Sequence, residues 1–158
     1  MCFDSLLLII NNNKIGIMAI SFAVEEIKFD LKEKKRIKQW ISTIVKNQKK
    51  RVGEIGYLFC GDEYLLTVNQ EYLNHDTYTD IITFDYVEGN VISGDIMISV
   101  ERVKENAAKF GVSFERELHR VIIHGVLHLL GNADKSDAEA AAMRQKEDEA
   151  LSILDTIQ

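Results

Sequence analysis

The chain has 158 residues, which is the length of one compact domain. Apolar residues make up 46% of it and charged residues 28%, a balance that excludes intrinsic disorder, collagen-like repeats and a simple coiled coil. The formal net charge of −6 argues against indiscriminate binding to polyanions, and the lack of proline argues against long rigid linkers.

The start of the chain carries an apolar run, Leu6 to Ile10, that is too short to span a membrane. No basic residue precedes this run and no small-residue cleavage site follows it, so we predict no signal peptide. A second methionine, Met18, stands before the first patterned segment. We therefore interpret residues 1–17 as an N-terminal extension and residues 18–158 as a single domain.

Cysteine usage fits a reducing compartment. Cys2 and Cys60 are the only cysteines in the sequence and form no CxxC motif, so neither a disulfide framework nor a zinc–thiolate site is predicted. Because no segment predicts a membrane span, we expect a cytoplasmic protein with no membrane partner.

The first half of the domain predicts two strands and two helices. Residues 20–24 and 55–59 alternate between apolar and other side chains, which is typical of half-buried strands. Between them, Asp30 and Glu33 form a capping-box pattern that predicts a helix start. This helix has an apolar stripe with helical spacing, formed by Ile37, Trp40, Ile41, Ile44 and Val45. After the second strand, Asp62 is expected to cap a helix that runs to about Tyr72.

The second half predicts a hairpin followed by three helices. Residues 81–87 and 91–100 are rich in β-branched and aromatic side chains and flank a glycine-containing turn. The helices are predicted near 99–110, 114–131 and 136–154. Gly111 should end the first of them, and Ser136 with Glu139 forms a capping box for the last. We expect an α+β fold in which a small mixed sheet of about four strands packs with about five helices.

Basic residues concentrate between residues 32 and 51, where nine of them stand against the single acid Glu33. One interpretation is a solvated helix face, which is the usual place for a charged run. The other is a basic face that binds RNA or an acidic protein. In that version Lys46, Lys49 and Lys50 are candidate substrate contacts.

The most informative motif is a pair of histidines in the predicted helix 114–131. His124 and His128 are four residues apart, so both imidazoles can reach the same point in space. Gly131 should end this helix and let the chain fold back, which places Asp134 as a third ligand. Two imidazoles and a carboxylate suit Zn²⁺, with the fourth position left for a water molecule that would serve as the catalytic group. The domain is therefore expected to be hydrolase-like and metal-dependent.

Two alternatives remain open for this helix. The histidines could be core residues, although imidazoles among valines, isoleucines and leucines need polar partners that a dry core rarely gives. Glu117 lies on the same helix face as His124. It either orients a ligand from behind the metal or acts as an acid in the first turn of the helix.

The residue after the first histidine, Gly125, bears on the reaction class. A zinc peptidase with an HExxH motif needs a glutamate there as its general base. The sequence therefore favours metal-assisted hydrolysis of another bond. A phosphodiester is a suitable target, because the cation would neutralise charge that develops on phosphate oxygens.

These residues resemble the YbeY family, metal-dependent endoribonucleases of ribosomal RNA maturation. The segment 124–131, HGVLHLLG, is similar to the family's HGxLHLxG motif. The blocks 69–84, 94–96 and 143–151 also resemble family segments, in the family's order. The resemblance spans residues 20–154. It implies that His124 and His128 bind zinc and that Asp134 holds the third ligand position.

Several positions depart from the family pattern. Asp134 stands where the family has a histidine ligand, which alters the charge at the metal. Leu73 replaces an arginine that is thought to contact the RNA backbone, and Tyr78 replaces a proline. His75 replaces a lysine and is either a weak phosphate contact or an exposed loop residue.

Asp80, Asp85 and Asp95 could be mistaken for a Mg²⁺-binding carboxylate cluster. Their spacing matches no metal motif, so we interpret them as structural residues at strand ends.

The leading hypothesis is a zinc-dependent, single-strand-specific endoribonuclease in ribosomal RNA processing. The resemblance implies maturation of the 16S rRNA 3′ end, ribosome quality control, and the small ribosomal subunit or its proteins as partners. Attack on phosphorus by metal-bound water and attack by the RNA 2′-OH are both compatible with the site. The alternative is a non-catalytic ribosome assembly factor with a structural metal, and a peptidase is the third hypothesis.

Overall fold

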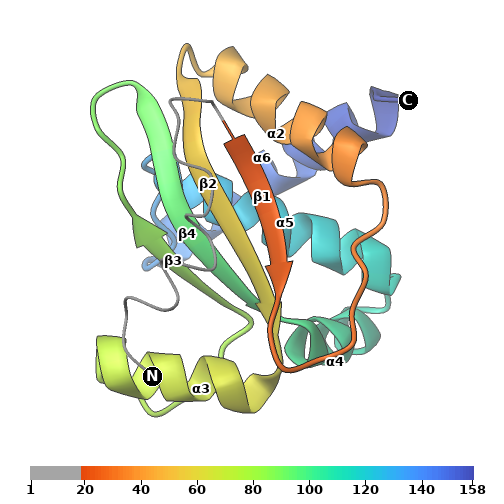
Figure 1. Ribbon diagram of the computed structural model, residues 1–158. Coiled ribbons are helices and arrows are strands. Elements are labelled where there is room, and N and C mark those ends of the chain that lie inside the picture. The colour runs from red at the N-terminus through yellow and green to blue at the C-terminus, as the bar shows by residue number, and fades with distance from the viewer. Residues whose placement is uncertain (1–18) are drawn as a thin grey trace.

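The computed structural model describes residues 19–158, so the interpretation of residues 1–17 as an extension lies outside the described residues. Four strands form one mixed sheet in the order β1-β2-β4-β3 (Figure 1). They are β1 (Ala19–Val24), β2 (Arg51–Cys60), β3 (Ile81–Asp85) and β4 (Val91–Ser99). The β1–β2 and β2–β4 pairs are parallel, and β3–β4 is the predicted antiparallel hairpin.

The described residues form five helices, as the sequence predicts. They are α2 (Lys34–Asn47), α3 (Asp62–Leu73), α4 (Val100–Phe110), α5 (Phe114–Leu129) and α6 (Asp137–Thr156). In Figure 1, α2, α5 and α6 lie behind the sheet. The opposite face packs against α3 through a smaller apolar cluster that includes Leu58, Leu65, Val68 and Met97. The predicted α+β class, one domain with a small mixed sheet, is confirmed.

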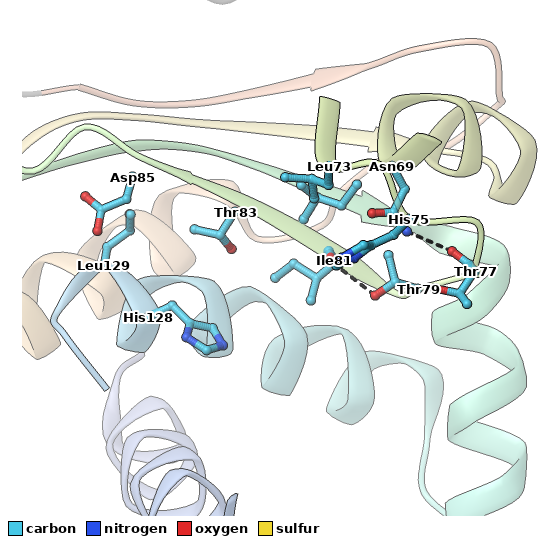
Figure 2. Close-up of a pocket in the computed structure, with 11 residues that line it drawn as sticks. Asn69, Leu73, His75, Thr77, Thr79, Ile81, Thr83, Asp85, His128 and Leu129 are labelled. Carbon is cyan, nitrogen blue, oxygen red and sulfur yellow. Dashed lines mark hydrogen bonds between the residues drawn. The ribbon is translucent and has the colours of Figure 1, made fainter. Parts of the chain in front are cut away.

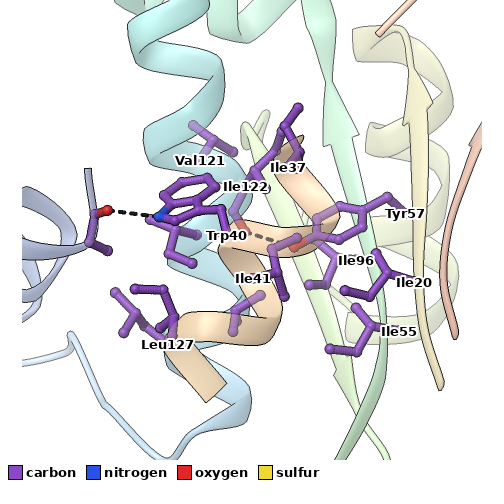
Figure 3. Packing of buried hydrophobic residues seen from close by; sticks show 14 of the residues in the cluster. Ile20, Ile37, Trp40, Ile41, Ile55, Tyr57, Ile96, Val121, Ile122 and Leu127 are labelled. Atoms are coloured by element: carbon purple, nitrogen blue, oxygen red, sulfur yellow. Dashed lines mark hydrogen bonds between the residues drawn. The ribbon is translucent and has the colours of Figure 1, made fainter. Parts of the chain in front are cut away.

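The main core lies between the sheet and the helices α2, α5 and α6. The predicted stripe of α2 is buried, and Trp40 at its centre donates a hydrogen bond from Nε1 to the Ala150 carbonyl of α6 at 2.7 Å. Tyr57 of β2 donates to the Ile122 carbonyl of α5 at 3.0 Å (Figure 3). Both polar atoms are thus satisfied inside an apolar core, and each ties a different element to its neighbour.

The predicted start of the first helix is wrong. The helix begins at Lys34, and Glu33 precedes it in a left-handed conformation with φ of 53° and no side-chain cap. Asp30 instead contacts Lys32 Nζ at 2.6 Å and Lys34 Nζ at 3.7 Å. The nearby ammonium groups therefore engage the carboxylate that the sequence assigned to a cap.

The other helix ends follow the sequence more closely. Ser136 and Glu139 form the predicted capping box, and Gly111 ends α4 with φ of 66°. For α3, however, Gly61 rather than Asp62 is the N-cap. The Asp62 carboxylate accepts hydrogen bonds from Ser99 and Arg102. Within residues 19–158, no helix is both long and apolar enough to cross a membrane.

Candidate metal centre and groove

Three potential ligand atoms converge where α5 ends. His124 Nε2 and His128 Nε2 are 2.9 Å apart, and Asp134 Oδ2 is 3.3 Å from each of them. The turn that brings Asp134 back is the predicted one, because Gly131 has φ of 94° and the Asn132 amide bonds the Leu127 carbonyl. The structure thus brings together the three residues that the sequence singles out.

The donor set fits a small divalent cation. Ligands bound tetrahedrally at about 2.0–2.1 Å from Zn²⁺ lie about 3.3–3.4 Å apart. Both Asp134–histidine separations, at 3.3 Å, match this value, and a small separation of the two rings would complete the geometry. No fourth histidine, cysteine or carboxylate within residues 19–158 joins the cluster. A cation held here would therefore keep an open position.

The cluster is open on one side. The side-chain exposure rises from 15% for His124 through 29% for His128 to 37% for Asp134. His124 therefore faces the protein interior, and Asp134 faces the solvent side from which a substrate would approach.

On its inner side, His124 contacts a buried carboxylate of α6. His124 Nδ1 lies 2.6 Å from Glu147 Oε1. Burial tends to raise the pKa of Glu147, but the His124 hydrogen bond and the charges of Arg120 and Arg144 outweigh it, so the pKa is below its usual value. Arg120 and Arg144 beside Glu147 also favour its ionised form, which can only accept hydrogen bonds.

Arg120 of α5 joins Glu147 to two further carboxylates. Its guanidinium contacts both oxygens of Glu147 at 3.3 Å and those of Glu117 at 2.5 and 2.9 Å. Asp80, before β3, is 3.7 Å from the same group. Burial disfavours the Arg120 charge, but the carboxylates of Glu117 and Glu147 outweigh that effect and raise its pKa.

The sequence leaves two roles open for Glu117, a residue that orients a ligand or an acid in the first turn of the helix. Glu117 lies in the first turn of α5 and bonds Arg120, whereas Glu147 makes the contact with His124. A sequence signal for Glu147 does exist. It interrupts the otherwise apolar buried stripe of α6, which consists of Met143, Glu147, Ala150, Leu151 and Leu154. A charged residue in such a stripe indicates a buried polar partner.

A groove with a volume of about 480 Å³ adjoins the cluster (Figure 2). His128 and Leu129 of α5 line one side, and β3 contributes much of the floor. Its other lining residues are Asn69, Leu73, His75, Thr77, Thr79, Ile81, Ile82, Thr83 and Asp85. No lysine or arginine is among these residues, so the described lining of the groove combines apolar and polar side chains and has no fixed cation.

Of the substrate-binding candidates, His75 lines this groove and the lysines do not. Lys46 and Lys49 are exposed at the C-terminal end of α2. Lys50 Nζ contacts Asn90 Oδ1 at 2.9 Å, in the turn between β3 and β4. The three lysines therefore gather at the end of the sheet where β3 finishes, the end that also carries Asp85 of the groove.

The three aspartates that could suggest a Mg²⁺ site have separate structural partners. Asp85 accepts a hydrogen bond from the Val87 amide at 2.8 Å, and Asp80 faces Arg120. Asp95 is buried, which raises its pKa although a hydrogen bond with Tyr86 opposes the shift. Within residues 19–158, the one cluster with metal-ligand spacing contains none of the three.

Gly125 lies against the sheet rather than beside the cluster. A Cβ atom at this position would lie 2.9 Å from Ile96 Cδ1 and 3.2 Å from Ile81 Cδ1. A glutamate side chain here would enter the packed core between α5 and β4. The position that an HExxH peptidase uses for its general base is thus occupied by a glycine, which allows close packing of α5 against the sheet.

The protein is therefore an α+β domain with an open His–His–Asp cluster, suited to bind a metal, at the end of a buried helix. Residues 19–155 match the family model described as Endoribonuclease YbeY. The chain belongs to the YbeY family.

Individual relatives agree with the family match. A Flavobacterium johnsoniae protein named Endoribonuclease YbeY is 56% identical over 128 residues, which cover 81% of this chain and 92% of the relative. A Bacteroides fragilis protein of the same name is 50% identical over 136 residues, or 86% and 98% of the two chains. The solution structure of TM1509 from Thermotoga maritima aligns with a TM-score of 0.60 at 28% identity, over 86% of this chain and 89% of that one.

Proposed function

We propose that this protein is a zinc-dependent endoribonuclease that cuts single-stranded RNA. The observation that carries the proposal is the convergence of His124, His128 and Asp134, with no fourth ligand from residues 19–158, beside a groove. Structural zinc is normally closed by four protein ligands, whereas catalytic zinc keeps a position open. The relatives' shared name, Endoribonuclease YbeY, gives the reaction class.

Several side chains would have distinct roles at this metal centre. His124, His128 and Asp134 would hold the cation through Nε2, Nε2 and a carboxylate oxygen. When bound, the cation would supply a lowered pKa for water and charge compensation for phosphate oxygens. Glu147 contacts His124 Nδ1 at 2.6 Å, on the nitrogen that is not part of the cluster.

The groove favours one unpaired nucleotide over a duplex. Its volume of about 480 Å³ is that of a small-ligand pocket, and its walls combine apolar Leu73, Ile81 and Leu129 with several threonines. Unstacked bases of single-stranded RNA can enter such a site, whereas paired bases cannot. Because no described cation lines it, we propose that the groove holds a base and its ribose while the phosphate lies at the cation.

Phosphate contacts are then expected outside the groove. Lys46, Lys49 and Lys50 lie at the same end of the sheet as Asp85, where they can contact the backbone of a bound strand. His75, in the groove wall, would contact the sugar or base of the same strand.

Membership of the YbeY family supports a proposal for the biological substrate. We propose ribosomal RNA as the substrate, with cleavage at the 16S rRNA 3′ end in the cytoplasm, a role in ribosome quality control, and the small ribosomal subunit or its proteins as partners. The net charge of −6 is compatible with this role. The protein would find its RNA through the surface of a partner and would not depend on general attraction to RNA phosphates.

Metal removal and restoration test the proposal. Purified protein treated with a chelator and then dialysed should stop cutting an end-labelled single-stranded RNA, and stoichiometric Zn²⁺ should restore cleavage. A 2′,3′-cyclic product end would identify the RNA 2′-OH as the nucleophile, and its absence would identify water. Full activity of verified metal-free protein would contradict the proposal.

A second candidate is an assembly factor with no cleavage activity. The replacement of the family arginine by Leu73, together with a groove that has no described cation, favours it. This candidate predicts that the protein binds the small ribosomal subunit equally well before and after mutation of His124. The nuclease predicts that the same mutation abolishes cleavage.

A further inference from the structure

Two buried glutamates share the guanidinium of Arg120. Glu117 and Glu147 are each 2% exposed, and each contacts Arg120. They differ in their other contacts: Glu147 also accepts a hydrogen bond from His124 and pairs with the half-exposed Arg144, whereas Glu117 makes neither contact. Comparing the two glutamates therefore distinguishes the effect of a buried negative charge from the effect of a hydrogen bond to a metal ligand.

We propose that Glu147 is a positioning residue that fixes the ring orientation and tautomer of His124, and that Arg120 holds Glu147 in place for this purpose. The inference rests on the proposed metal-dependent function of the same cluster. Because an ionised carboxylate only accepts, His124 must donate from Nδ1 and present the unprotonated Nε2 to the cation.

The surroundings of Glu147 leave its carboxylate little freedom. Oε1 receives His124 Nδ1 at 2.6 Å and Arg120 at 3.3 Å, and Oε2 receives Arg120 at 3.3 Å and Arg144 at 3.4 Å. All of these partners are donors, and the carboxylate is removed from solvent. A rotation that broke the His124 contact would also break an ion pair in a weakly screened environment.

The two histidines are held differently. Within residues 19–158, His128 Nδ1 has no hydrogen-bond partner, and this ring is twice as exposed as that of His124, at 29% against 15%. His128 also lines the groove. The geometry therefore makes His124 the fixed ligand and His128 the ligand that can adjust when a cation binds.

The charges around the cluster, like its geometry, favour the binding of a cation. Arg120 faces three carboxylates, those of Asp80, Glu117 and Glu147, and Asp134 adds another at the ligand position. The excess of negative charge favours a divalent cation nearby. Glu117 contributes negative charge but contacts no ligand. Replacing it with neutral glutamine therefore measures the effect of charge alone on cation affinity.

Zinc affinity of matched variants separates the two contributions. Full-length, chelator-treated protein is titrated with Zn²⁺ in competition with a chromophoric chelator. Glu147→Gln should weaken Zn²⁺ binding by about 10- to 100-fold, the usual effect of losing such a partner. Glu117→Gln removes the same charge from the same arginine and should change the affinity by less than about 3-fold. Equal losses in the two variants would overturn the proposal.

A measurement on the unmutated protein is independent of variant folding. The ¹⁵N and ¹H chemical shifts of the histidine rings in metal-free protein, at a pH where they are neutral, report which nitrogen carries the proton. The proposal predicts the proton of His124 on Nδ1, and a proton on Nε2 would overturn it. If wild-type protein bound no Zn²⁺ at all, the proposed function would fail. If wild type bound Zn²⁺ and the two glutamine variants bound it with equal affinity, the proposed function would stand. Only the positioning role of Glu147 would be excluded.

Discussion

Two glycines set how closely α5 and the β3–β4 hairpin approach each other. Gly125 of α5 lies against Ile96 of β4, and Gly94 of β4 lies against Leu129, the groove residue that follows His128. A side chain at either position would push the end of α5 away from the sheet. The spacing that forms the groove wall beside the metal cluster thus depends on the absence of two methyl groups.

Gly94→Ala should destabilise the protein. The new methyl group would lie 2.5 Å from the Phe84 carbonyl oxygen and 2.7 Å from Leu129 Cδ2, so β3 or α5 must move. Overpacking of this kind costs about 1–3 kcal/mol in the free energy of unfolding. Urea denaturation measures it, and an unchanged free energy would show that the hairpin yields without cost.

His119 should make stability depend on pH. It packs edge-on against Trp40, and burial lowers its pKa below the ordinary value of 6.5, although Glu115 and Glu33 oppose the shift. Arg36 and Arg116 lower it further. The folded state therefore binds fewer protons than the unfolded chain, so this contribution to stability is complete above pH 6.5 and is lost as the pH falls below it.

The matching experiment compares His119→Gln with wild type by urea denaturation at pH 7 and pH 5. Because every other residue is the same in the two proteins, the difference between them isolates His119. The variant should lose less unfolding free energy over this interval than wild type. Identical losses would mean that His119 titrates normally in the folded protein.

At the scale of elements, α5 and α6 are joined by two kinds of ion pair. Arg120 pairs with buried Glu147, whereas Arg116 pairs with exposed Asp155 at 3.0 Å. Both pairs link the same two helices. The difference in burial decides which of them matters to stability.

Arg120→Met should lower the free energy of unfolding by about 3–5 kcal/mol, because it leaves buried Glu117 without a cation and buried Glu147 with only the exposed Arg144. Arg116→Met removes an exposed pair between the same helices and should cost at most about 1 kcal/mol. Chemical denaturation of both variants checks the contrast. Similar values would indicate that solvent reaches the Arg120 cluster.

The elements also show what the sequence can predict. The stripe of α2 and the capping box of α6 are local patterns, and the structure confirms both. The α2 start was mispredicted because Asp30 pairs with two lysines, an alternative that the capping pattern does not exclude. Sheet order and the contact of Glu147 with His124 join residues distant in sequence, so no local pattern specifies them.

For the site, spacing alone was sufficient for His124 and His128, since a helix fixes their relation. Asp134 required a turn, which Gly131 signals in the sequence. The groove was not predictable in the same way. Its lining comes from α3, the loop after it, β3 and α5, and their meeting is a property of the tertiary fold.

At the scale of the whole molecule, the basic residues and the groove lie in different parts of the structure. The basic stretch lies on and around α2, while the described groove lining has no lysine or arginine and includes Asp85. An RNA strand that enters the groove must therefore obtain its phosphate contacts elsewhere on the surface. Lys46, Lys49 and Lys50 are the candidates at the nearest end of the sheet.

Replacing Lys46, Lys49 and Lys50 by glutamine should weaken RNA binding and flatten its salt dependence. Three lost phosphate contacts would reduce the slope of log K against log salt by about 2 for a single strand. Fluorescence anisotropy at several salt concentrations measures this. Glutamine at Lys28, Lys104 and Lys109, which are exposed on other segments, is the charge-matched control. An unchanged slope in the first variant would exclude this end of α2 from the interface.

The most direct test of the metal-dependent nuclease is single-turnover cleavage of an end-labelled single-stranded RNA by wild type and His124→Ala, purified identically. His119→Gln serves as the control, because it changes a histidine of the same helix that takes no part in the cluster. We expect cleavage by wild type and by the control, and none by His124→Ala. Equal cleavage by all three proteins, or none by wild type loaded with Zn²⁺, would contradict a metal-dependent nuclease.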